Sequence, residues 1–120
     1  MRTSFPKRSK EILRDIYLEV KHARKYKVKD QFAFIKNYIQ VGLLHAGWTW
    51  KNITDILINI EIKMRDVGKD VEFIKLYRQF CKQDTLTYIN WVVTDVIIFL
   101  SRLAVDHTDI LEAIVDGYWK

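Results

Sequence analysis

Apolar residues recur along this chain with a period close to that of an α-helix, and single turn residues separate the runs. The first run, Pro6 to Lys25, has one apolar stripe with most of its basic residues on the opposite side. A second run covers Gln31 to Ala46, with Asp30 before it as an N-cap and Gly47 after it as a left-handed C-terminal residue. Its apolar positions cover more than one stripe, which predicts neighbours on two sides.

The middle of the chain predicts two more helices. Thr49 precedes a run from Trp50 to Val67 that has the cleanest helical period in the sequence, and Gly68 closes it. Asp70 then caps a fourth helix that runs to about Lys82. A glycine and a cap residue therefore lie at each boundary of the third helix, Gly47 and Thr49 before it and Gly68 and Asp70 after it.

The longest apolar run, Thr85 to Val105, is apolar on nearly all sides and has Asp84 before it as a cap. Its valine and isoleucine content favours a strand, but about twenty residues without a turn residue exceed the length of a normal strand. We therefore predict a fifth helix at the centre of the bundle. Thr108 caps a short last helix from Asp109 to Val115.

These runs predict an all-α fold, a compact bundle of five or six helices in a single domain over residues 1–120, with residues 1–5 a candidate disordered segment. The composition agrees, because 49% apolar residues, four Gly and one Pro exclude collagen-like and disordered classes. Asp95 and Arg102 lie within the longest apolar segment, so we expect no membrane insertion. A single cysteine, Cys81, and the lack of an apolar signal segment predict a cytoplasmic protein.

The positive charge is concentrated at the start of the chain. Of the net charge of +5, residues 1–29 contribute +7, from ten Lys or Arg and three acids, and the remaining residues contribute −2. Such a surface attracts phosphate backbones or an acidic protein partner. We predict a small, non-enzymatic protein that contacts nucleic-acid backbone without sequence specificity, alone or as a subunit of a larger assembly. The candidate contact residues are Lys7, Arg8, Lys10, Arg14, Lys21, Arg24, Lys25, Lys27 and Lys29. Phe5 and Tyr26 are candidates for stacking on bases.

An alternative interpretation is enzymatic. The segment RLAVDH resembles the Arg-x-x-x-x-His spacing of HEPN-type ribonucleases, in which the two side chains meet at a helical dimer interface. The resemblance implies that Arg102 neutralises a scissile phosphate and that His107 exchanges protons with the reacting hydroxyl. Leu103 stands where a polar residue often follows that arginine. A structural role for Arg102 is the other possibility, an ion pair with Asp95 that sets the helix register.

A third interpretation is an inhibitor or adaptor protein, of the kind that viruses and mobile elements encode. Trp119 is a candidate anchor for a partner protein, and Tyr118 and Trp119 together are candidate contacts of a homodimer. The segment TDVIIFLSRLAVDHTDILEA resembles in rhythm the last helix pair of MazG-like nucleotide pyrophosphohydrolases, which hold magnesium by clustered carboxylates. Val92 stands where an acid is expected in that pattern. We therefore predict no metal site and no cofactor.

Overall fold

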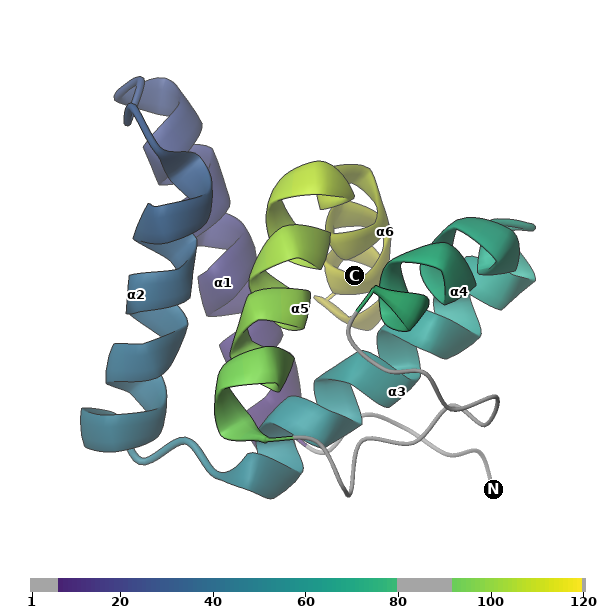
Figure 1. The fold of residues 1–120 in the computed structure, drawn as a ribbon, viewed down its shortest axis with the longest axis horizontal. Coiled ribbons are helices and arrows are strands. Elements are labelled where there is room, and N and C mark those ends of the chain that lie inside the picture. The colour runs from purple at the N-terminus through teal and green to yellow at the C-terminus, as the bar shows by residue number, and fades with distance from the viewer. Residues whose placement is uncertain (1–6, 80–91, 120) are drawn as a thin grey trace.

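The computed structural model describes residues 7–79 and 92–119, without the side chains of Lys7 and of residues 117–119. Six helices make up this part of the chain. They are α1 (Lys7–Lys25), α2 (Gln31–His45), α3 (Trp50–Asp66), α4 (Asp70–Arg78), α5 (Val93–Asp106) and α6 (Thr108–Trp119) (Figure 1). No strand occurs within these residues, so the all-α prediction is confirmed. Predictions for residues 1–5, Cys81, Asp84 and the side chain of Trp119 lie outside the described residues.

The boundaries of α2 and α3 lie close to those that the caps predict. The Asp30 carboxylate accepts a 3.0 Å hydrogen bond from a first-turn amide of α2. At α3 the Thr49 hydroxyl accepts from the Asn52 amide (3.1 Å), and the Asn52 side chain accepts from the Thr49 amide (2.9 Å), which completes a capping box. Gly47 and Gly68 have φ of 75° and 76°, the left-handed conformation that favours glycine after a helix.

The predicted boundaries of α4 are wrong at both ends. Asp70 is the first helical residue rather than the cap, and the helix ends at Arg78 rather than near Lys82. The backbone amide of Lys69 donates to the Met64 carbonyl (2.7 Å) and so belongs to the closing turn of α3. The two helices therefore share this turn, which leaves Asp70 in the first turn of α4, where the helix dipole favours an acid.

Helix α5 begins later than predicted. Val92 is extended, with φ −72° and ψ 150°, so a single helix from Thr85 to Val105 is wrong, and residues 85–91 lie outside the described residues. The β-branched side chain of Val92 favours the extended backbone seen there, and Asp95 in the first turn suits a helix start at Val93. Helix α6 begins at Thr108, so Thr108 is its first residue rather than its cap, and the helix continues past the predicted end at Val115 to Trp119.

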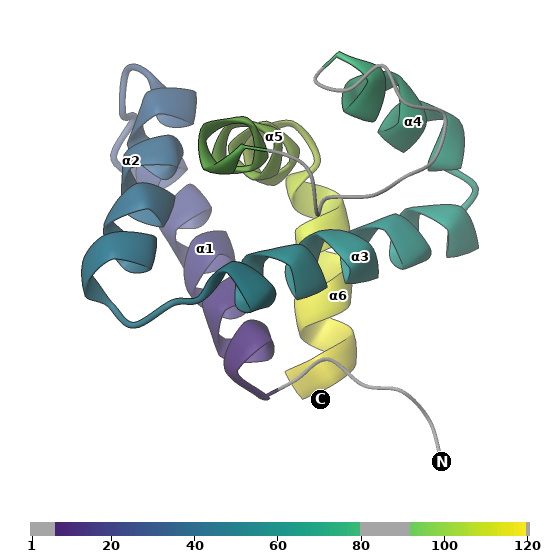
Figure 2. The same ribbon diagram turned by 60° about the horizontal axis from the view of Figure 1, so that its bottom comes forward.

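The core forms where α1 meets the helices around it. Helix α1 packs against α2, α3, α5 and α6 (Figure 2). On its apolar stripe, Ile12, Ile16 and Val20 are fully buried. Helix α5 packs against α1, α2 and α6 and buries half of its residues. The radius of gyration is 13.6 Å, about that expected for a compact domain of this length. The basic helix is thus an integral part of the bundle, and only its outer face is exposed.

Candidate nucleic-acid interface

Helix α1 separates its charges onto two flanks of its exposed face. Glu11, Asp15 and Glu19 recur every four residues and so follow one flank. Burial and the neighbouring Glu11 raise the pKa of Asp15 above its usual value. The other flank carries Lys10, Arg14, Lys21 and Lys25. A row of acidic side chains therefore runs alongside the candidate contact residues on this helix.

Two of the candidate cations are engaged in holding helix ends. The Arg8 guanidinium donates a 2.8 Å hydrogen bond to the Ala46 carbonyl at the end of α2. The Arg24 guanidinium donates to the Val105 carbonyl (2.9 Å) and to the Thr108 hydroxyl (2.7 Å), where α5 turns into α6. Carbonyls at helix C-termini carry partial negative charge and favour such donors. We assign structural roles to both arginines.

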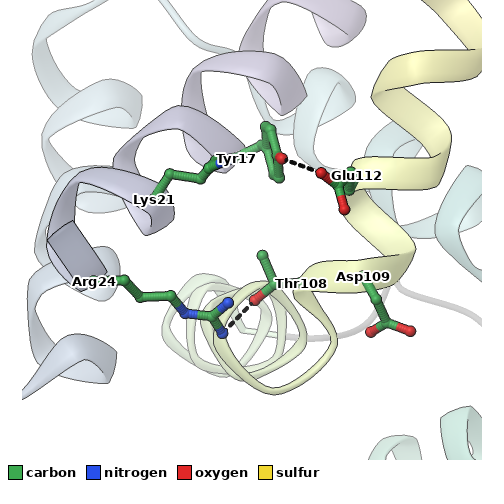
Figure 3. Close-up of a pocket in the computed structure, with 6 residues that line it drawn as sticks. All are labelled: Tyr17, Lys21, Arg24, Thr108, Asp109 and Glu112. Atoms are coloured by element: carbon green, nitrogen blue, oxygen red, sulfur yellow. Dashed lines mark hydrogen bonds between the residues drawn. The ribbon is translucent and has the colours of Figure 1, made fainter.

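The groove between α1 and α6 has walls of opposite charge. Its volume is about 260 Å³, and its lining residues are Tyr17, Lys21, Arg24, Thr108, Asp109 and Glu112 (Figure 3). The Tyr17 hydroxyl donates a 2.8 Å hydrogen bond to the Glu112 carboxylate, and Asp109 pairs with Lys69 at 3.5 Å. Two acids of α6 and two cations of α1 line this groove, so its lining carries no net formal charge.

Positive charge is concentrated at the end of α1 and in the turn before α2. We call residues 21–30 the basic tip; they include five cations and one acid, Asp30, whose carboxylate caps α2. Lys25, Lys27 and Lys29 are all exposed there. In Figure 1 this turn lies at the upper left and projects beyond the ends of α5 and α6. The fold thus gathers the second half of the basic segment at one protruding end.

Lys27 occupies a backbone position that favours glycine. Its φ is 53°, and it is the one non-glycine residue at positive φ in the described part of the chain. The Val28 amide donates to the Ala23 carbonyl (2.9 Å), and the Lys27 amide donates to the Arg24 carbonyl (3.2 Å). This is the Schellman pattern, in which the left-handed residue is most often glycine. A lysine here keeps a cation at the tip at a conformational cost of about 1 kcal/mol.

Lys27→Gly is expected to raise the free energy of unfolding by up to about 1 kcal/mol, because glycine adopts this φ without the steric cost of a Cβ. Thermal and urea unfolding followed by circular dichroism measure the change. Lys27→Ala is the matched control, since alanine also lacks the charge but retains the Cβ, and we expect no gain from it. Equal stability of the two variants would contradict the strain at this position.

Aromatic rings accompany the cations at the basic tip. The exposed ring of Tyr26 lies 4.6 Å from the ring of His22, measured between centroids. At the start of α2, the guanidinium carbon of Arg102 lies 4.0 Å from the centroid of the Phe32 ring. Sequence reasoning singled out Tyr26 but missed His22, although their spacing of four residues in a helix places them side by side.

Arg102 and His107, the two residues of the enzymatic interpretation, contact different parts of the structure. Arg102 lies on α5 and stacks over Phe32 of α2, whereas His107 is the C-cap of α5, and its amide donates to the Leu103 carbonyl (2.8 Å). Among the contacts of the described residues there is none between Arg102 and His107, and none between Arg102 and Asp95. The expected ion pair on α5 is therefore replaced by a cation–π contact.

No protein-family model, curated protein or solved structure matches this chain. Within residues 7–79 and 92–119, no group of three His, Cys, Asp or Glu side chains is arranged to hold a metal ion. No helix in the same described ranges has the length and apolar character needed to cross a membrane. A functional assignment therefore rests on the geometry of the basic tip.

Proposed function

We propose that this protein binds nucleic acid through backbone phosphates at the basic tip, without reading the base sequence. The observation that carries this proposal is the gathering of Lys25, Lys27 and Lys29, all exposed, on a projecting turn whose one acid caps α2. Flexible lysine side chains on a convex turn suit the regularly spaced phosphates of a backbone and provide no rigid fork for reading base edges.

The remaining cations contribute less to this surface. Arg8 and Arg24 are bound to carbonyls, and the Lys21 amine lies 5.6 Å from the centroid of the Tyr17 ring in the α1–α6 groove. We therefore expect about three to five phosphate contacts in total, which corresponds to a slope of roughly −2.7 to −4.5 for log K against log salt on duplex DNA. A weak, strongly salt-dependent interaction is the expected behaviour.

Replacing Lys25, Lys27 and Lys29 together with glutamine tests the proposal. Each lost phosphate contact reduces the salt slope by about one, so the triple variant should bind more weakly at low salt and have a slope shallower by about 2–3. Fluorescence anisotropy with a labelled duplex of arbitrary sequence, titrated over a series of salt concentrations, measures both quantities. Lys27→Gly alone should weaken binding even though it stabilises the fold.

A matched control removes three charges from another part of the molecule. Lys51, Lys75 and Arg78 are exposed on α3 and α4, and their replacement with glutamine gives the same net charge as the tip variant. We expect the control to keep most of the affinity and the full slope. If both variants lose the same amount of affinity, the binding depends on net charge rather than on the tip. Absence of binding at low salt, or binding that does not respond to salt, contradicts the proposal.

A further inference from the structure

We infer that the nucleic acid bound at the basic tip is single-stranded, and that an unpaired base stacks on the ring of Tyr26. The inference rests on the proposed function for the backbone contacts, but a separate observation carries it. That observation is the arrangement of aromatic rings at the tip, which phosphate binding alone does not explain.

Three rings form a row that runs from the solvent into the domain. Tyr26 is 62% exposed, its ring centroid lies 4.6 Å from that of His22, and His22 in turn lies 6.4 Å from the half-buried Phe34 with an interplanar angle of 13°. We call Tyr26, His22 and Phe34 the ring row. Phe34 packs against the core, so the inner end of the row is anchored to the bundle.

The outer end of the ring row offers an aromatic surface next to cations. The amine of Lys25 lies 5.4 Å from the centroid of the Tyr26 ring, and Lys27 follows directly in the chain. A lysine side chain has several rotatable bonds, so the Lys25 amine can move from the ring to a phosphate when a base takes its place. Ring and cations together match the two parts of a nucleotide, its base and its phosphate.

Only unpaired bases can use such a ring. In a duplex both faces of each base are covered by its neighbours in the stack, whereas a single strand presents free faces that stack on aromatic side chains with little dependence on sequence. A tyrosine that is mostly exposed adds little to the core, so its ring is available for this contact. The structure thus favours a single strand over a duplex as the ligand of the tip.

Three probes of equal phosphate number separate the base contact from the backbone contact. They are a short oligothymidylate, an abasic phosphodiester chain of the same length, and a duplex. At one low salt concentration, anisotropy should show tighter binding of oligothymidylate than of the abasic chain, by about 5- to 140-fold for one stacked base. Tyr26→Ala should remove this difference, and Tyr26→Phe, which keeps the ring, should retain it.

Leu44→Ala is the matched control, because Leu44 is a large apolar side chain, 75% exposed on α2 near the far end from the tip. Its variant should bind all three probes as the wild type does. Equal, salt-dependent binding of oligothymidylate and the abasic chain would overturn the stacking inference and leave the phosphate contacts standing. Loss of preference in Tyr26→Phe would also overturn it. Failure to bind any of the probes would overturn the proposed function itself.

Discussion

Phe99→Ala is expected to lower the free energy of unfolding by about 3–5 kcal/mol, the usual cost of deleting a buried aromatic ring. Phe99 on α5 is fully buried, and its ring makes edge-on contacts with two rings of α4. The centroid distances are 5.5 Å to Phe73 and 6.3 Å to Tyr77, with interplanar angles of 70° and 81°. Since domains of this size are stable by about 5–15 kcal/mol, the loss is a large fraction of the total.

Urea unfolding followed by circular dichroism measures this change. Phe99→Leu should cost clearly less than Phe99→Ala, because leucine keeps much of the buried apolar surface. Val71→Ala is the control on α4, since Val71 is exposed and its truncation should stay within about 0.5 kcal/mol. A cost below about 1 kcal/mol for Phe99→Ala would show that these rings do not join α4 to α5.

Gly42→Ala should destabilise the protein by about 1–3 kcal/mol, although the same substitution inside a helix normally gains about 1 kcal/mol. Gly42 lies in α2, and a Cβ at this position would be 2.4 Å from Cε3 of the Trp48 ring. Trp48 is buried and its ring packs edge-on against Tyr38, with the centroids 5.6 Å apart. An added methyl group would therefore overlap the indole and force the ring or α2 to shift.

A double-mutant cycle with Trp48→Leu isolates this contact. The smaller side chain leaves space over α2, so Gly42→Ala should cost much less in the Trp48→Leu background than in the wild type. The melting temperatures of the four proteins give the comparison. A higher melting temperature for Gly42→Ala in the wild-type background would mean that helix propensity outweighs the steric contact, contrary to our expectation.

The helix boundaries that the sequence predicts correctly are those that depend on local chemistry. Asp30 and Thr49 cap the helices that follow them, and Gly47 and Gly68 adopt the left-handed conformation, all within a few residues of the chain. The predicted start of α5 is wrong, because the apolar pattern continues through Val92, where the backbone is extended. Hydrophobic periodicity gives no sign of such a break.

The candidate site was only partly predictable for a similar reason. The excess of lysine and arginine in residues 1–29 is visible in the sequence, and so is Tyr26 among these cations. The partners of Arg8 and Arg24, however, are carbonyls 38 and 81 residues away. Only the tertiary structure shows that these two side chains bind helix ends, and that Phe34 supports the ring row.

The contact between the first and last helices has a consequence for synthesis of the chain. Tyr17 on α1 bonds Glu112 on α6, 95 residues later. At the usual rate of translation, this separation corresponds to about 5–20 s. Throughout that interval, the apolar stripe of α1 cannot be covered by all of its native neighbours. Nascent polypeptides of this protein therefore emerge from the ribosome with a cationic amphipathic segment whose apolar face is exposed. Such a segment is a suitable substrate for a chaperone until the remaining helices have been synthesised.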